Sequence, residues 1–426
     1  MLSTSASSLA SGGNGLATTA ALNRNLPLFD WYTMPEAFSA PLVVDAIKEF
    51  GVPEGGTVLD PFCGTGTTLV AARLAGRHAV GIEVNPFLCM ASRVKTRERF
   101  NLPLLRIEVE RLLRSARLVL RGADEGRMPH LADKLPDMPR LERWIARRVA
   151  LKVLALRELI EEHLSPQNRE IALLALAAIL RGASNMKLSP HAFGSREVKQ
   201  DAPVMSLFEI RLGKMLDDIQ GLQGMEGLGH AQVIEGDVRR ARDMEHKLLP
   251  AHLAITSPPY LNNLDYTMQT RMELFFLGFV QSMEELKHLR KRMMVCDAKA
   301  TYKDIEDWRR VEEVQSVADV ARALDDELGD RNWGWNYGLM TRQYFGGLLR
   351  ALEAVRPLLA PGAPFVIIVG ESAHAGILVP VPDMAAELGQ LAGYEATEVR
   401  VLRTRRSSSH KFGLKESAVV LRRGSG

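Results

Sequence analysis

The sequence predicts an α/β protein whose single open sheet is interrupted by two insertions. Apolar, strand-like runs alternate with helical patterns near both ends of the 426-residue chain. A glycine-rich turn joins the first of these runs to a helix, and two long segments lack strand patterns. Because alternating strands and helices build sheets with helices on both faces, we expect one sheet made from both ends of the chain.

The first elements predict a strand–helix–strand unit. The segment TVLDPFCGTGTTLVAARLAG (57–76) predicts a short strand, a tight turn and a helix, and HAVGIEVNP (78–86) predicts a second strand. This order implies parallel strands. From about residue 91 to 228 apolar residues recur at helical spacing, as in LKVLALRELIEEHL, and no strand is evident. We expect residues 91–228 to form a largely helical insertion.

Strand patterns return in the second half of the chain. They lie at residues 231–238 (AQVIEGDV), 251–259 (AHLAITSPP) and 363–372 (APFVIIVGES), and a helix is predicted at 340–359. A polar, basic stretch at about 280–331 forms the second insertion. Near the end, EATEVRVLRTR and ESAVVLRR alternate in polarity and predict a closing antiparallel pair.

Composition limits the class of protein. The formal net charge of +3 permits a polyanionic partner without requiring one. The cysteines Cys63, Cys89 and Cys296 have neither disulfide nor metal spacing, which favours a reducing, cytoplasmic compartment. The histidines are scattered, so no metal is expected. No segment is apolar enough to span a bilayer, and residues 1–24 predict a disordered tail without a signal peptide.

The turn DPFCGTGTT after the first strand is a candidate nucleotide site. Gly64 and Gly66 lack a Cβ, so the backbone can turn tightly and approach a ligand there. The following helix directs its free N–H groups to the same place. The second strand ends at Glu83, whose carboxylate can accept two ribose hydroxyls. The alternative is an ordinary strand–helix turn. However, the carboxylate of Asp60 and the aromatic ring of Phe62 would cost folding free energy at this place unless a ligand binds there.

A second unusual turn is AITSPPYLNNLDYT (254–267), where an apolar run ends in two prolines. Adjacent prolines remove two backbone donors and fix two φ angles, so no sheet continues through them. The alternative is a rigid strand-ending turn with a packed tyrosine. Asn262, Asn263, Asp265 and Tyr266 follow and would rim a pocket; the alternative for the asparagines and the aspartate is capping of the next helix.

The motifs DPFCGTGTT, GIEVNP and TSPPY together resemble the amino-methyltransferases that modify exocyclic amines of DNA bases. In that family the first strand ends in D-P-F-x-G-x-G-T, the second in an acid that holds the ribose, and a later strand in [DSN]-P-P-[YFW]. The resemblance covers about residues 28–90 and 231–422. It implies a Rossmann-like class I methyltransferase fold, with an open, mostly parallel seven-stranded sheet. Residues 91–228 match no family motif.

The resemblance also implies S-adenosylmethionine as the cofactor. The helix predicted within residues 38–51 would pack near its methionine end, and the acid of EGDVRR (235–240) would meet its adenine. The implied cofactor-binding residues are Asp60, Phe62, Cys63, Gly64, Thr65, Gly66, Thr67, Glu83, Asn85 and Asp237.

By the same resemblance, Ser257, Pro258, Pro259 and Tyr260 are the catalytic residues. The Ser257 hydroxyl and the Pro258 carbonyl would accept hydrogen bonds from the target amine and localise its lone pair toward the methyl group. The Tyr260 ring would stack on a base extruded from the duplex. Serine at the first position favours N4 of cytosine over N6 of adenine. No cysteine follows a proline, as the nucleophile of cytosine C5 methylation would.

Two basic runs are candidate phosphate contacts. They are KHLRKRMM (287–294) and RTRRSSSHK (403–411); the residues concerned are Lys287, Arg290, Lys291, Arg292, Arg403, Arg405 and Arg406. Solvated surface charge is the alternative, and it is favoured for the arginines between Arg93 and Arg157. The aromatic rings of NWGWNYG (332–338) could stack on bases or pack in the core.

The sequence thus predicts a site-specific methyltransferase of double-stranded DNA, favouring cytosine N4, with a cognate restriction endonuclease as a partner to be considered. Alternatives are an adenine-N6 enzyme, an RNA (tRNA) methyltransferase and a catalytically inactive nucleic-acid-binding relative. The intact GTG and SPPY motifs argue against the last. The predicted division is a tail (1–24), a first catalytic part (25–90), a candidate target-recognition insertion (91–228) and a second catalytic part (229–426). The oligomeric state stays open.

Overall fold

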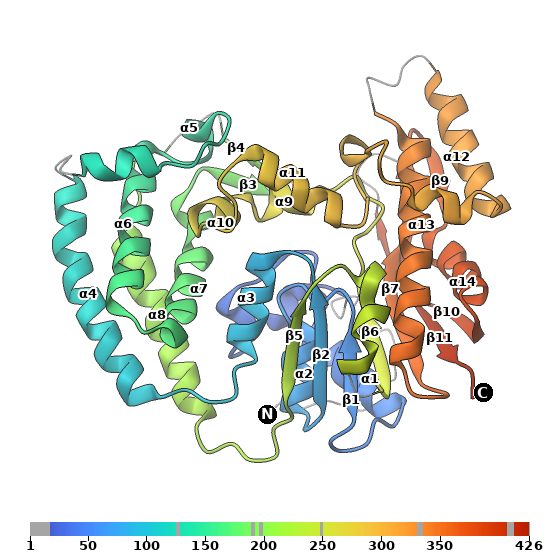
Figure 1. The fold of residues 1–426 in the computed structure, drawn as a ribbon, viewed down its shortest axis with the longest axis horizontal. Helices are drawn as coiled ribbons and strands as arrows, with labels where there is room; N and C mark the ends of the chain where they lie inside the picture. The colour runs from blue at the N-terminus through green and yellow to red at the C-terminus, as the bar shows by residue number, and fades with distance from the viewer. Residues whose placement is uncertain are drawn as a thin grey trace.

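The fold was obtained as a computed structural model and is built on one seven-stranded sheet (Figure 1). The structure describes residues 18–124, 128–188, 192–195, 199–247, 250–329, 335–406 and 413–425. The strands of the sheet are β1 (Thr57–Asp60), β2 (His78–Glu83), β5 (Ala231–Glu235), β6 (Leu253–Thr256), β7 (Pro364–Gly370), β10 (Tyr394–Arg406) and β11 (Gly413–Arg423).

The order of the strands is β10-β11-β7-β6-β1-β2-β5. The pairs β5–β2, β2–β1, β1–β6 and β6–β7 are parallel, whereas β11 runs antiparallel to both β7 and β10. The predicted open, mostly parallel sheet of a Rossmann-like methyltransferase is therefore confirmed, and so is the closing antiparallel pair. Its strands come from both sides of the long insertion.

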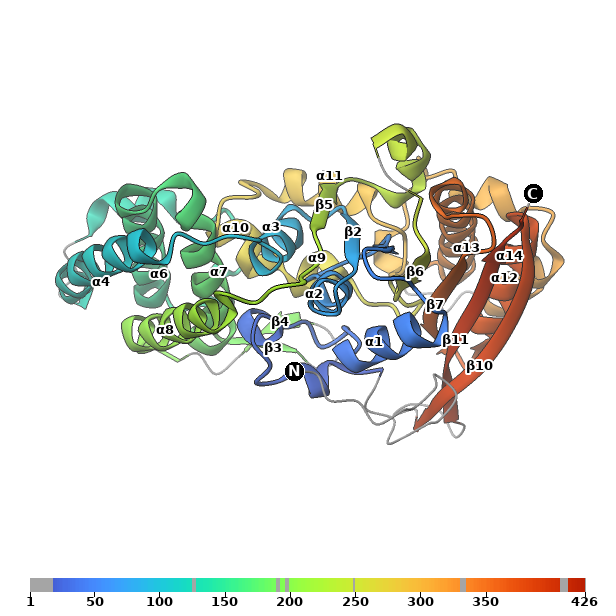
Figure 2. The same ribbon diagram turned by 90° about the horizontal axis from the view of Figure 1, so that it is seen from below.

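Successive strand residues point to opposite faces of the sheet, so each strand contributes to two cores. Val58 of β1 belongs to a core with α1 and α2, whereas the adjacent Leu59 belongs to a core with α13 and α14. In β7, Val366 and Phe365 divide in the same way. Helices therefore cover both faces (Figure 2), and the central strands β1, β6 and β7 are buried along their whole length. The edge strands β5 and β10 keep polar and exposed residues.

The helices follow the predicted alternation. Those that pack on the sheet are α1 (Ala40–Glu49), α2 (Thr67–Leu74), α3 (Pro86–Lys95), α13 (Tyr337–Val355) and α14 (Val381–Leu391). The 3-10 helices are η1 (Ala20–Asn23), η2 (Phe29–Trp31), η3 (Pro129–Lys134), η4 (Val238–Lys247), η5 (Ala298–Ala300), η6 (Asp307–Val311) and η8 (Arg356–Leu358). None of the described helices is long and apolar enough to cross a membrane.

The first insertion forms a helical lobe beside the sheet (Figure 1). Its helices are α4 (Leu102–Asp124), α5 (Leu141–Trp144), α6 (Arg147–His163), α7 (Pro166–Ala183) and α8 (Val204–Leu222). The lobe also contains a two-stranded hairpin, β3 (Met186–Leu188) and β4 (Ala192–Gly194), which the sequence did not suggest because three-residue strands leave no periodic pattern. Helix α7 packs against α3, so the lobe is anchored next to β2.

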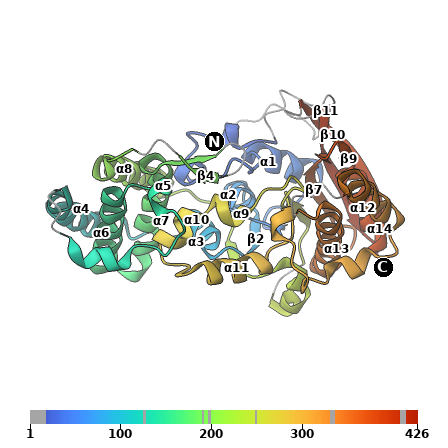
Figure 3. The same ribbon diagram turned by 90° about the horizontal axis from the view of Figure 1, so that it is seen from above.

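The second insertion lies over the end of the sheet. Its helices are α11 (Met283–Arg292) and α12 (Gln315–Leu328), and α9 (Tyr266–Gln269) and α10 (Arg271–Phe276) precede it. Seen from above, α9, α10 and α11 lie between the helical lobe and α13 (Figure 3). A small hairpin, β8 (Ser372–His374) and β9 (Ile377–Val379), follows β7.

The predicted tail is partly structured. Residues 18–24 include η1, and Asn23 is buried, with its side chain bonded to the Phe38 carbonyl and the Ala40 N–H at 2.9 and 2.8 Å. This differs from the disorder expected for residues 1–24, because a buried asparagine with two backbone partners cannot be recognised from composition. Residues 1–17 lie outside the described part.

Two helical glycines in different surroundings, Gly346 where α13 packs on η6 and Gly213 in α8, predict opposite effects of Gly→Ala substitution on stability. A Cβ on Gly346 would lie 1.9 Å from the Asp307 carbonyl oxygen, whereas nothing lies within 4 Å of a Cβ on Gly213 in α8. We expect Gly346→Ala to lower the free energy of unfolding by about 3 kcal/mol or more. Gly213→Ala should raise it by about 0.5–1 kcal/mol through helix propensity alone. Urea unfolding of both variants measures this, and equal stabilities would contradict the close approach.

Candidate active site

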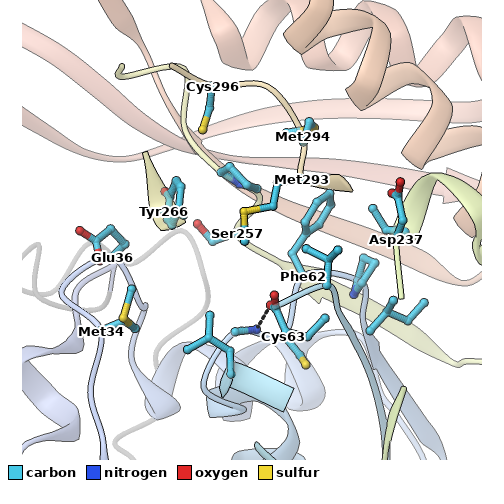
Figure 4. A pocket seen from close by; sticks show the side chains of 18 of the residues that line it. Met34, Glu36, Phe62, Cys63, Asp237, Ser257, Tyr266, Met293, Met294 and Cys296 are labelled. Carbon is cyan, nitrogen blue, oxygen red and sulfur yellow. Dashed lines mark hydrogen bonds between the residues drawn. The ribbon is translucent and has the colours of Figure 1, made fainter. Parts of the chain in front are cut away.

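A pocket lies at the carboxyl ends of β1, β2, β5 and β6 (Figure 4), where an open parallel sheet binds its ligands. Segments before α1 and after α11 close its sides. The predicted residues that line it are Asp60, Phe62, Cys63, Gly64, Thr65, Thr67, Glu83, Asp237, Ser257, Pro259, Arg290 and Arg292. The glycine-rich turn and the proline turn, nearly 200 residues apart in the chain, therefore face one cavity.

The glycine-rich turn is shaped by contact with α3. Gly64 and Gly66 have φ angles of 49° and 82°, in the left-handed region that favours glycine. A Cβ on Gly66 would lie 3.2 Å from the Ser92 Cα, and the Ser92 hydroxyl donates to the Gly64 carbonyl at 2.7 Å. No atom lies within 4 Å of a Cβ on Gly64, although that residue lines the pocket. Gly66 thus serves packing, and Gly64 leaves room for a ligand.

Asp60 connects the two turns directly. Its carboxylate accepts hydrogen bonds from the hydroxyls of Thr68 in α2 and Thr256 in β6, both at 2.6 Å, and from the Phe62 N–H at 3.0 Å. Burial raises the pKa of Asp60 to about 6, and these three donors oppose the shift. Thr256 immediately precedes Ser257, so this carboxylate fixes the start of the proline turn against the glycine-rich turn.

Glu83 at the end of β2 also holds the glycine-rich turn. Its carboxylate accepts from the Gly64 N–H at 3.0 Å and from the Asn85 N–H at 2.8 Å. Burial raises the pKa of Glu83 to about 7. Asn85 does not line the pocket; it caps α3 through the Phe87 N–H and donates to the Thr270 hydroxyl at 2.9 Å.

Asp237 lies at the far side of the pocket, after β5. Its carboxylate pairs with Arg239 at 2.7 Å, and Arg239 also pairs with the buried Asp307 of η6 at 2.5 Å. Charged hydrogen bonds to the two aspartates raise the pKa of Arg239 against the effect of burial, so this side of the pocket has a fixed ionic frame.

The proline turn contributes Ser257 and Pro259 to the pocket, whereas Pro258 and Tyr260 do not line it. The Tyr260 hydroxyl donates to the buried carboxylate of Glu416 in β11 at 2.8 Å. The aromatic residues that do line the cavity are Phe38, Phe62 and Tyr266, of which the last two are labelled in Figure 4. Tyr266 begins α9, and its hydroxyl accepts from the Tyr260 N–H at 3.4 Å.

Other lining residues could not be assigned from the sequence. Met34 and Glu36 precede α1, and Met293, Met294 and Cys296 follow α11 (Figure 4). These segments have no periodic pattern, and only the chain path brings them to the strand ends. Cys63 and Cys296 line the pocket as buried thiols, and burial raises the pKa of both, which keeps them protonated.

Most of the predicted phosphate-contacting cations already have acidic partners. Arg290 pairs with Asp265 at 2.7 Å, Lys291 with Asp304 at 2.7 Å, Lys287 with Glu284 at 3.5 Å and Arg403 with Glu416. The Arg405 guanidinium donates to the Glu371 carbonyl, and Arg406 is exposed. Residues 407–412 and Trp333 lie outside the described residues. Trp335 and Tyr337 pack against the core that contains α13 and α14.

The strand order, the glycine-rich turn and the proline turn in one pocket define the class as a Rossmann-like methyltransferase. Residues 27–93 match the family of N6/N4 methyltransferases described as DNA methylase. The Type II methyltransferase M.BsoBI of Geobacillus stearothermophilus is 23% identical over 458 residues, which cover 94% of this chain and 85% of that protein. The Type II methyltransferase M.AvaI of Nostoc sp. is 24% identical over 416 residues, covering 91% and 83%.

The predicted resemblance to DNA amino-methyltransferases of restriction–modification type is thereby confirmed, since residues 27–93 match their family model and both relatives are Type II methyltransferases. Among solved structures, the rRNA methyltransferase aviRa of Streptomyces viridochromogenes aligns with 95% of this chain and 93% of its own. Its TM-score of 0.31 and identity of 11% are too low to support a substrate.

Proposed function

We propose that this protein transfers a methyl group from S-adenosylmethionine to the exocyclic amine of a base flipped out of double-stranded DNA, with cytosine N4 favoured. The observation that carries the proposal is the hydrogen bonding of Asp60 to Thr68 and Thr256, which joins a nucleotide-type turn to a Ser-Pro-Pro-Tyr turn. Similarity to two Type II methyltransferases favours a restriction–modification role, with a cognate endonuclease as partner.

Two features of the pocket support S-adenosylmethionine as the methyl donor. The space at Gly64 accommodates a ligand close to the backbone, and the Glu83 carboxylate is an acceptor for ribose hydroxyls. Phe62 offers a ring beside Asp237, where an adenine would lie. When bound there, the cofactor supplies a methyl group on a positively charged sulfur.

Activation of the amine is assigned to Ser257 and the Pro258 carbonyl. The lone pair of an exocyclic amine is delocalised into the ring, so two acceptors that bind its N–H groups favour a tetrahedral nitrogen. The remaining rate enhancement would come mainly from positioning, with the amine nitrogen held in line with the methyl group that it attacks. Because the Tyr260 hydroxyl is tied to Glu416, we assign base stacking to Tyr266 as well as Tyr260.

Target recognition is assigned to the two insertions, because the compact sheet has few side chains to place in a groove. The segment after α11 reaches the pocket itself through Arg292 and Met293. Cations in both insertions are partly neutralised by acids, as in the Arg117–Glu209 and Lys291–Asp304 pairs, so proximity to the pocket distinguishes the two. This makes the second insertion the stronger candidate for contacts next to the flipped base.

The test is to incubate the protein with unmodified plasmid DNA and S-adenosylmethionine, digest the DNA to nucleosides and identify the product by mass. We expect N4-methylcytosine. Only N6-methyladenine would overturn the base assignment, and a product found solely in a parallel tRNA incubation would overturn the DNA assignment.

Ser257→Ala should lower the rate of methyl transfer by about 100-fold, because an acceptor for the amine is lost at the reacting centre. The dissociation constant for S-adenosylmethionine should stay within about twofold of wild type, since Ser257 is assigned to the amine alone. Single-turnover methylation and calorimetric titration measure the two quantities. A collapse of cofactor binding would contradict this role.

The pKa of Glu83 predicts a pH-dependent cofactor affinity. Ribose hydroxyls donate to the ionised carboxylate, so protonation below its pKa of about 7 should weaken binding, approaching tenfold per pH unit. Glu83→Gln should bind more weakly at pH 8 and lose this dependence. Cofactor affinity is measured for both proteins from pH 5.5 to 8.5. Ionisation of the cofactor affects both equally, so the difference between the two profiles reports on Glu83. Parallel pH profiles would show that Glu83 does not contact the ligand.

A further inference from the structure

Glu36 is a pocket residue with an unused carboxylate oxygen. It lies in the segment between η2 and α1 and lines the cavity on the side of Ser257 and Tyr266 (Figure 4). Its Oε2 atom is buried and has no hydrogen-bond partner among the described residues. A buried acceptor without a partner is costly, and it is therefore a sign of a ligand group that completes it.

The segment that carries Glu36 is fixed on both sides. Before it, the buried Lys95 amine donates to the Tyr32 carbonyl at 2.5 Å. After it, the Asn23 side chain binds the Phe38 carbonyl and the Ala40 N–H. The position of the carboxyl group therefore does not depend on a free loop, as placement of a reacting group requires.

The electrostatic surroundings make Glu36 a stronger base than an exposed glutamate. Burial raises the pKa of Glu36, while its own backbone N–H and Arg181 of α7 lower it. The other titratable groups that face it are Tyr266 of α9 and Tyr32 of its own segment, both with pKa values well above 10 through burial. Tyr32 donates to the carboxylate of Glu273 in α10 at 2.9 Å.

The proposed reaction leaves one proton to be placed. The amine nitrogen forms the new N–C bond with its lone pair, and the C–S electron pair passes to sulfur. The nitrogen then carries a positive charge and must lose one N–H proton. A serine hydroxyl and a peptide carbonyl accept hydrogen bonds but are too weakly basic to keep a proton, so a carboxylate is the group to look for.

The other carboxylates that line the pocket are already engaged. Asp60 and Glu83 accept the hydroxyl and backbone donors described above, and Asp237 and Asp265 are paired with arginines. Asp297 accepts from the Lys299 N–H at 2.8 Å. Among the lining carboxylates, only Glu36 has an oxygen that is both buried and without a partner in the described part of the chain.

We propose that Glu36 is a further catalytic residue, the base whose carboxylate accepts the proton released by the target amine. This inference rests on the proposed function. As the N–C bond forms, the carboxylate stabilises the positive nitrogen and takes its proton, giving a neutral methylamino group and a carboxylic acid. The acid returns its proton to water after the product leaves.

The experiment is single-turnover methylation of unmodified plasmid DNA from pH 5.5 to 9, with saturating tritiated S-adenosylmethionine. Wild type should lose rate as the pH falls through the pKa of Glu36, because the protonated acid cannot accept a proton. Glu36→Gln should be about 100-fold slower on the plateau, with little dependence on pH. Glu36→Asp should still lose rate at low pH, and its plateau rate should lie between those of wild type and Glu36→Gln.

Glu273→Gln is the matched control, because Glu273 is a buried glutamate behind the same segment with a pKa of about 7 and does not line the pocket. Glu273→Gln should lose rate at low pH as wild type does. Glu36→Gln should bind the cofactor at pH 8 with wild-type affinity. A wild-type pH profile in Glu36→Gln, or loss of the limb in Glu273→Gln alone, would overturn the assignment to Glu36. Failure of the wild-type protein to methylate any nucleic acid would instead overturn the proposed function, and this inference with it.

Discussion

The arrangement of the active site depends on one buried carboxylate, that of Asp60. It ends β1, and its three donors come from α2, from the turn that follows it and from β6. Hydrogen bonds to an ionised group contribute about 1.5–3 kcal/mol each, enough to offset much of the cost of burying the charge. The same contacts fix the separation between the glycine-rich turn and Ser257, on which an in-line transfer would depend.

Acidic side chains line the pocket, and each is bound by a different kind of partner. Asp60 is bound by hydroxyls, Glu83 by backbone N–H groups, and Asp237 through Arg239 to the buried Asp307. Burial raises the pKa of Asp60 and Glu83, so their donors are needed to keep them charged. Such a frame leaves few unsatisfied groups, which is why the free oxygen of Glu36 is informative.

The two insertions differ in their relation to the chemistry. The helices α4, α6, α7 and α8 of the lobe pack on one another and share one apolar core with a face of the sheet. Helix α7 contacts α3, α10 and η2, and Lys214 and Asp218 of α8 bind Asp30 and Trp31. The second insertion instead contributes the pocket wall after α11. Under the proposed function, the lobe would present a large surface to the DNA, whereas the segment after α11 would contact the base held in the pocket.

The sequence by itself determined the sheet and the two motifs. Its strand patterns predicted β1, β2, β5, β6, β7 and the β10–β11 pair. The glycine and proline turns predicted which strand ends would form the pocket, because φ restrictions act locally. Tertiary structure alone decided the rest. Glu36 and Met293 enter the pocket from segments without periodicity, and Arg290 and Arg403 have acidic partners distant in sequence or on a neighbouring strand. Ion pairing and cavity lining depend on which chain segments meet in space, and no local pattern records that.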